Sequence, residues 1–151
     1  METSNVRSIA SLNHLSALSQ YFFPFGNYIF PLLIWSFSKN KSSFNNFHGK
    51  QSLNFQLSIL LYSLILLCIA IPIFIFWLVD FINNTNIDFQ SIEIETTFTN
   101  QNITGFIIIG LVAVLLFLLL KATEFFLIIY AAVKSANGEY YKYPLTIHFI
   151  K

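Results

Sequence analysis

The sequence carries few charges and no dense basic block. Charged residues make up 10% of its 151 positions and hydrophobic residues 56%, whereas a soluble domain usually carries about 25% charged residues. The net charge is +1, so a nucleic-acid-binding role has no electrostatic support. A water-soluble globule of this size could not hide so much apolar surface. We therefore expect a membrane protein that binds no nucleic acid.

Cysteine and catalytic motifs are equally scarce. The single cysteine, Cys68, lies in an apolar run and can form neither an intramolecular disulfide nor a metal cluster, so we expect it to serve packing. His14 and His48 have no further ligand at the usual spacing, so no metal site is predicted. The chain also lacks a serine elbow, a phosphate loop and an HExxH run. We predict a protein that is not an enzyme and holds no cofactor.

The first residues, METSNVRSIASLNHLS, lack the continuous apolar core and the small-residue cleavage site of a signal peptide. We expect them to be retained, and the hydrophobic segments to direct membrane insertion. Two segments are long enough to cross a bilayer, residues 51–82 and 103–136, because a span needs about 20 apolar residues. Pro72 is expected to kink the first, and Asn137-Gly138 to end the second.

The residues before these segments form a less regular pattern. Residues 8–38 contain a helix-like stretch, a break at Pro24-Phe25-Gly26 and a second short apolar stretch. They predict two short helices that form either a hairpin or an interfacial helix followed by one span, and we favour the hairpin. The expected fold is an all-α integral membrane protein with a single domain over residues 1–151.

Loop charges predict the orientation. The loop between residues 39 and 50 and the tail after the last segment both carry lysines, whereas residues 80–102 contain neither lysine nor arginine. The positive-inside bias places the 39–50 loop and the C-terminus in the cytoplasm, and the acidic 83–102 loop outside. A bacterial inner membrane is the expected location. We interpret residues 137–151 as an interfacial tail, with Tyr140, Tyr141 and Tyr143 at the headgroup level.

Polar residues recur at helical spacing within the apolar segments. One stripe follows the start of the 51–82 segment, and a second follows the first short helix. Facing amides and hydroxyls of this kind can hydrogen-bond helices together or line a hydrophilic groove. The members are Gln51, Asn54, Ser58 and Tyr62 in the first stripe, and Asn13, Ser16 and Gln20 in the second.

Lys121 and Glu124 lie three residues apart inside the last segment. A charge near the bilayer centre costs about 2.5–3.5 kcal/mol on insertion scales, so the chain must accommodate both. Three readings stay open: a structural ion pair facing the bundle, snorkelling of Lys121 to an interface, and a site for a solute, a proton or a partner helix.

Three stretches of the chain are similar to the Tic-twenty-like family: LNHLSALSQYFFPFGNYIFPLLIW, FHGKQSLNFQLSILLYSL and AAVKSANGEYYKYPLTIHFI. That family comprises a chloroplast inner-envelope protein-import component and small bacterial membrane proteins. The resemblance covers residues 11–82 and 103–150. It implies a compact helical membrane domain with both termini on one side, and membership of an inner-membrane complex concerned with protein translocation or assembly. It supplies motif residues without a catalytic role: His48, Lys50, Gln51, Asn54, Gly138, Glu139 and Pro144.

The expected function is that of an accessory or scaffolding subunit that binds other membrane proteins or copies of itself. The alternative is an oligomeric subunit of a small-solute or ion transporter or channel, with Lys121, Glu124, Asn54 and Gln51 along its path.

Overall fold

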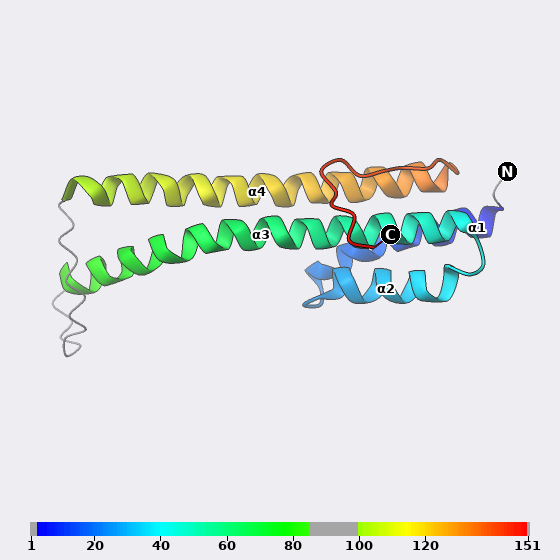
Figure 1. Ribbon diagram of the computed structural model, residues 1–151, viewed down its shortest axis with the longest axis horizontal. Coiled ribbons are helices and arrows are strands. Elements are labelled where there is room, and N and C mark those ends of the chain that lie inside the picture. The colour runs from blue at the N-terminus through cyan, green and yellow to red at the C-terminus, as the bar shows by residue number, and fades with distance from the viewer. Residues whose placement is uncertain (1–2, 85–99, 151) are drawn as a thin grey trace. The chain divides into compact units, whose positions relative to one another are not determined.

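The computed structural model describes residues 3–84 and 100–150, and within these ranges every regular element is helical. α1 (Ser4–Leu15) continues into the short 3₁₀ helix η1 (Ser16–Tyr21), and α2 (Gly26–Ser38) follows after a turn. Two long helices complete the chain, α3 (Ser43–Asn84) and α4 (Asn100–Ala136) (Figure 1). The predicted all-α class is confirmed, with two long apolar helices and an N-terminal pair of short ones.

The chain divides into two compact units. The first, which we call the polar-cored unit, comprises Met1–Leu61 and Leu120–Lys151. The second, the apolar unit, comprises Tyr62–Leu119. α3 and α4 each contribute residues to both.

The turn between η1 and α2 has the break that the sequence predicted. Phe25 adopts a left-handed conformation (φ 62°) just before the first residue of α2, Gly26. A Cβ on Gly26 would lie 2.6 Å from Ser19 Oγ and 2.9 Å from the carbonyl carbon of the same residue. Only glycine permits so close an approach of η1 to α2. The turn therefore folds the two short helices back against each other.

The long helices differ from their predicted bounds. α3 begins at Ser43, earlier than the segment 51–82, because SFNNFHGK continues the helix with polar residues that become buried. It passes through Pro72 without ending. α4 ends at Ala136, and Gly138 adopts the expected left-handed conformation (φ 83°). Of the predicted outer loop 83–102, both ends belong to these helices, and residues 85–99 lie outside the described residues.

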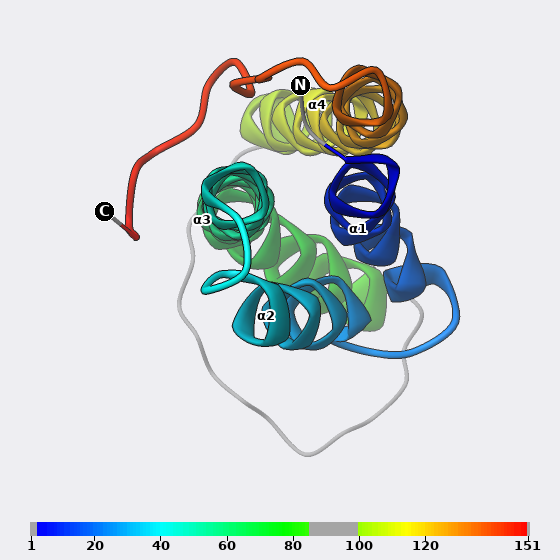
Figure 2. The same cartoon turned by 90° about the vertical axis from the view of Figure 1, so that its right-hand side faces the viewer.

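The interior of the polar-cored unit is unusually polar. Figure 2 shows the ends of all four helices gathered here, with the C-terminal tail crossing from α4 to the outside of α3. Amides, hydroxyls, two histidines and one carboxylate are buried between them, whereas much of the outer surface of α2 is apolar. This arrangement suits a bundle that contacts lipid, because groups that cannot hydrogen-bond to hydrocarbon are turned inward. The buried polar residues include Asn13, His14, Asn27, His48, Gln51, Asn54, Gln56, Ser58 and Glu124.

The apolar unit has the opposite composition. Its parts of α3 and α4 belong to two helices that are long and apolar enough to cross a membrane, over Ser43–Val79 and Ile107–Ala136. Most described side chains of Tyr62–Leu119, the residues of the apolar unit, are exposed. Cys68 is also exposed, so the prediction that it serves packing is wrong. Outward-facing apolar side chains on helices of this length are typical of lipid contact.

Candidate functional site

Three buried side chains are linked in a row by hydrogen bonds across the polar-cored unit. Tyr143, from the C-terminal tail, places its hydroxyl 2.9 Å from Nδ1 of His14 in α1. Nε2 of His14 lies 2.9 Å from Nδ1 of His48 in α3. All three rings are well shielded from solvent. The tail, the first helix and the first long helix are thus joined by one hydrogen-bonded relay, which we call the Tyr–His–His relay.

The direction of this relay depends on the tautomer of His14. Burial raises the pKa of the Tyr143 hydroxyl well above 10.0, so the hydroxyl stays protonated and can donate to His14 Nδ1. In the tautomer with its proton on Nε2, His14 donates in turn to His48 Nδ1. Burial, and secondarily the neighbouring His48, lower the pKa of His14 from 6.5 to about 3. A neutral His14 supplies one donor and one acceptor, as the relay requires.

Aromatic rings surround the relay. Phe55 stacks on Tyr143 with ring centroids 4.0 Å apart, and Phe44 lies 4.3 Å from the ring of His48. Tyr140 packs edge-on against Phe44 at 5.0 Å. These contacts exclude water from the histidines and account for the desolvation that lowers the pKa of His14. The relay is therefore embedded in a dry aromatic shell.

A second polar site centres on Glu124 in α4. Lys121 Nζ donates to Glu124 Oε2 at 2.8 Å, and Gln20 Nε2 donates to Oε1 at 3.0 Å. Glu124 is fully buried, whereas the side chain of Lys121 is 32% exposed. Both carboxylate oxygens therefore have a donor, one of them a cation. This is the geometry of a structural ion pair facing the bundle, the first of the three readings of the sequence.

The C-terminal tail is held by the polar stripe of α3. Asn54 Oδ1 accepts from the backbone N–H groups of Phe149 and Ile150, at 3.1 and 2.8 Å, and its Nδ2 donates to the carbonyl of Ile150 at 3.0 Å. Ser58 Oγ accepts from the backbone N–H of Ile147 at 2.8 Å. All four bonds use tail backbone. The tail forms no helix or strand, so the side chains of Asn54 and Ser58 supply hydrogen-bond partners that regular secondary structure would otherwise give its backbone.

Further amide contacts join the short helices to each other and to α3. Asn13 Nδ2 donates to the carbonyl of Pro31 at 3.2 Å, and Asn27 Nδ2 donates to Gln56 Oε1 at 2.8 Å. Trp35 Nε1 donates to Asn46 Oδ1 at 2.9 Å, near the opposite end of α2. These bonds tie α2 to α1 and to α3. Within the described residues, Asn13 Oδ1, both side-chain polar atoms of Asn45, Gln51 Oε1 and Gln56 Nε2 are buried without a hydrogen-bond partner.

The predicted stripe residues occupy this interior, but with unexpected partners. Gln51 is buried on α3, and Tyr62 is half-buried at the start of the apolar unit. Ser16 Oγ donates to the carbonyl of Asn13 at 2.7 Å, within its own helix region. Asn54 and Ser58 bond to the C-terminal tail, and Gln20 bonds to Glu124 in α4. The helical spacing of the stripes could not predict these partners.

The motif residues lie within the polar-cored unit, at different depths. His48 is buried in the relay, and Lys50 is half-buried on α3. Gly138 ends α4 beside the Arg7 side chain, which a Cβ there would meet at 3.1 Å. Glu139 accepts from Lys134 Nζ at 2.7 Å, and Pro144 is exposed. None of these geometries brings a nucleophile and a base together.

Two residues depart from expectation. Tyr143 is 5% exposed and belongs to the core, so its predicted place at the headgroup level is wrong; Tyr140 remains exposed. The partnership of His14 with His48 was missed, because 34 residues separate them. Among the described residues, no group of three or more histidine, cysteine, aspartate or glutamate side chains could hold a metal ion.

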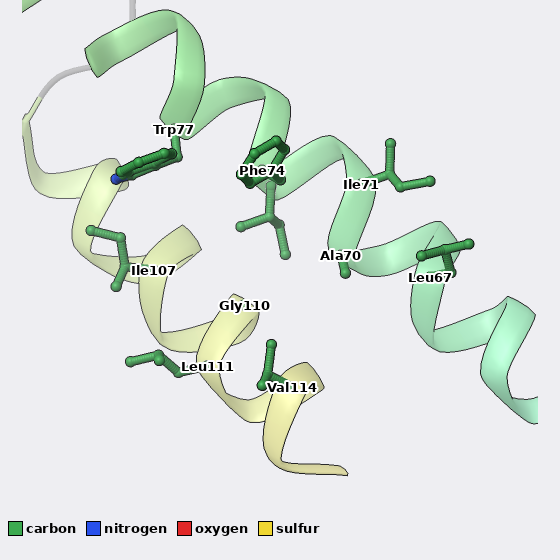
Figure 3. Close-up of a pocket in the computed structure, with 10 residues that line it drawn as sticks. Leu67, Ala70, Ile71, Phe74, Trp77, Ile107, Gly110, Leu111 and Val114 are labelled. Carbon is green, nitrogen blue, oxygen red and sulfur yellow. The ribbon is translucent and has the colours of Figure 1, made fainter. Parts of the chain in front are cut away.

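The apolar unit contains a cavity between its parts of α3 and α4. Its volume is about 580 Å³, and its lining is apolar, with the indole of Trp77 near one end and Gly110 facing Ile73 (Figure 3). A Cβ on Gly110 would lie 3.1 Å from Ile73 Cγ2. Figure 3 shows side chains of both helices around the space and no charged group among those drawn.

The fold and these contacts define a class: small polytopic membrane proteins with a hydrogen-bonded polar bundle and two long apolar helices. More narrowly, the chain belongs to the MamF/MmsF family, the magnetosome magnetite crystal formation protein family, whose model matches residues 5–150. This match overturns the predicted Tic-twenty-like membership, and protein translocation loses its support with it. No curated protein and no solved structure matches the chain.

Proposed function

We propose that the protein is a non-catalytic accessory subunit of the membrane in which magnetosome magnetite crystals form. Membership of the family supports a role in crystal formation. The contacts inside the polar-cored unit support a structural rather than a catalytic or conducting role. Its buried carboxylate and the buried amides of Asn13, Asn27, Asn54 and Gln56 form hydrogen bonds within the chain. The exposed apolar faces of α2 and α4 remain for lipid and for other membrane proteins.

The observation that carries this proposal is the full burial of Glu124 and the bonding of both its oxygens to protein donors. A proton- or ion-conducting carboxylate needs an oxygen that a water or an ion can reach. Both oxygens of Glu124 are bonded to protein donors, Lys121 and Gln20, and the side chain is fully buried. A carboxylate held in this way fixes the register of α4 against η1.

We also propose an orientation and a mode of association. The 39–50 loop and the C-terminal tail, both lysine-bearing, face the cytoplasm, and the acidic residues between the two long helices face the opposite compartment. Partner membrane proteins, or further copies of the chain, pack on the exposed apolar faces. Both statements are expectations from charge and exposure.

The test uses a magnetosome-forming cell from which this protein has been removed. The intact protein or a variant is then supplied to that cell. Loss of the protein should change the size or number of magnetite crystals seen by electron microscopy, and the intact chain should restore them. Glu124→Gln keeps the shape of the side chain and should restore crystals wherever the protein still accumulates. Mild-detergent purification from the same cells should recover partner membrane proteins with the intact chain.

Two results would contradict the proposal. Unchanged crystals without the protein would remove the role in crystal formation. A solute or ion flux in proteoliposomes that Glu124→Gln abolishes, with assembly intact, would instead identify a transporter subunit.

A further inference from the structure

The turn between η1 and α2 presents a cluster of exposed aromatic rings. Tyr21, Phe22, Phe23 and Phe25 are 59%, 84%, 62% and 68% exposed, and Pro24 lies among them. We call residues 21–25 the aromatic turn. Exposed apolar clusters of this kind mark a surface that is covered by something other than water.

The aromatic turn is continued by two residues of α4. The ring of Tyr21 lies edge-on to Phe125 with centroids 6.4 Å apart, and Phe125 contacts Phe126, which is 69% exposed. Both belong to the polar-cored unit, so the cluster lies within one compact unit. The turn is therefore level with the Glu124 site, because Gln20 and Tyr21 contact adjacent residues of α4.

The backbone of the aromatic turn is largely self-sufficient. The N–H groups of Phe22 and Phe23 donate to the carbonyl of Ser19, and that of Gly26 donates to the carbonyl of Phe23. The carbonyl of Phe25 accepts from two residues of α2, and Pro24 has no N–H to satisfy. Irregular backbone that faces lipid is not found within the hydrocarbon core, so the backbone of the turn lies at the edge of the core and its rings point inward. The internal bonds leave few of its polar groups to be satisfied there.

α2, the arm that follows the turn, is too short to take it across a bilayer. It has 13 residues, which at 1.5 Å each measure roughly 20 Å, against a hydrocarbon core of about 30 Å. α2 begins at the turn and ends before the loop that contains Lys39 and Lys41. With these charged residues held at one surface, a tilted α2 keeps the turn in the nearer half of the core, and the chain returns to the surface from which it entered.

We propose that the aromatic turn is a lipid-insertion element that buries its rings among the acyl chains of one leaflet, from the side that holds Lys39 and Lys41. The partner is the leaflet interior. The turn itself contains no charged side chain, and among its side chains only the Tyr21 hydroxyl can hydrogen-bond. A protein-binding surface usually adds a polar rim and about one hydrogen bond per 100–200 Å².

The test measures depth with a nitroxide label. Cys68→Ser removes the only cysteine, and single cysteines at Phe23, Asn40 and Ile69 then receive the label in proteoliposomes. Asn40 is exposed in the loop after α2 and serves as the water reference, and Ile69 is exposed on the apolar part of α3 and serves as the hydrocarbon reference. Collisions with oxygen and with a water-soluble nickel reagent are compared, and spin-labelled lipids calibrate the depth.

The label at position 23 should collide with oxygen as the label at position 69 does, lose most of its nickel collisions relative to position 40, and lie short of the midplane. Nickel collisions equal to those at position 40 would overturn the proposal. So would a depth beyond the midplane, because the rings would then lie in the other leaflet. Loss of collisions with both reagents, or spin coupling between copies that persists on dilution with lipid, would assign the surface to a protein partner or a second copy.

A matched pair of variants separates the rings from the fold. Phe22→Ser removes the most exposed ring of the turn and should raise nickel collisions at position 23, because the tip moves toward water. Phe37→Ser removes an equally exposed ring at the other end of α2, 74% exposed, and should leave position 23 unchanged. Equal responses to the two variants would show that the rings of the turn do not set its depth.

Discussion

The polar-cored unit and the apolar unit use the same two long helices in opposite ways. In the first, α3 and α4 turn amides, hydroxyls and a carboxylate inward and are tied to the short helices and the tail by hydrogen bonds. In the second, the same helices present apolar side chains outward and line an open apolar pocket. Directional bonds specify one arrangement, whereas apolar contact in lipid specifies little, because lipid tails are as apolar as leucine. Substitutions in the first unit should therefore cost more stability than matched ones in the second.

The largest difference should come from Glu124→Ala. Removing one partner of a buried ion pair costs about 3–5 kcal/mol, and we expect about 3 kcal/mol because Lys121 is partly exposed and can reach solvent. The measurement is the free energy of unfolding in mixed micelles titrated with a denaturing detergent. Leu118→Ala, at an exposed position of the apolar unit, is the control and should change it little. Equal losses for both variants would remove the distinction between the units.

Acid should act on the polar-cored unit through His14. Its pKa is about 3 in the folded chain and 6.5 in the unfolded chain, so only the unfolded chain binds the proton between these values. Stability is therefore full above pH 6.5 and is lost as the pH falls toward 3. At about pH 4.5 the loss should be about 2.7 kcal/mol, since each unit corresponds to about 1.36 kcal/mol.

Unfolding measured against pH in the same micelles checks this slope. His14→Gln should reduce the slope, whatever its effect at neutral pH. His148→Gln, at an exposed histidine of the tail outside the relay, should keep it. A slope that survives His14→Gln would place the acid sensitivity elsewhere.

Two glycines sharpen the comparison through packing. A Cβ on Gly49 would clash with the ring of Trp35 and would lie 2.8 Å from the Cβ of Trp35. A Cβ on Gly105 would meet nothing within 4 Å. Gly49→Ala should cost about 2 kcal/mol, because overpacking a well-filled core costs about 1–3 kcal/mol. Trp35 fluorescence should also shift as its bond to Asn46 is disturbed. Gly105→Ala should be neutral or slightly stabilising.

The smallest expected effect is local and concerns the tail. Asn54→Ala removes three bonds to tail backbone and should raise the population of the undocked tail about tenfold, which corresponds to about 1.4 kcal/mol. Trypsin cleavage after the exposed Lys142 should accelerate accordingly. Ser58→Ala removes one bond and should have a smaller effect, and Leu64→Ala should have none. Unchanged cleavage in Asn54→Ala would show that other contacts hold the tail.

The helical class and the turn at Pro24–Gly26 were predictable because they depend on local signals, such as apolar length, a proline and a glycine. The close pair of Lys121 and Glu124 was predictable for the same reason, since three residues separate them. The relay was not, because His14, His48 and Tyr143 come from three distant segments and each looks ordinary alone. The burial of Tyr143 reversed a sound expectation for tyrosines near a membrane. The family was missed because short stretches of polar and apolar residues do not separate one family of small membrane proteins from another.

The polar-cored unit has a polar interior and an apolar surface, and this arrangement has a practical consequence. Its dependence on amphiphile resides in outward-facing aliphatic and aromatic side chains such as Ile29, Leu33 and Phe37, none of which takes part in the hydrogen bonds described above. Exchanging these for lysine and glutamate would leave the internal bonding pattern untouched. The bundle is thus a natural starting point for a water-soluble derivative whose histidines and carboxylate can be titrated directly in solution.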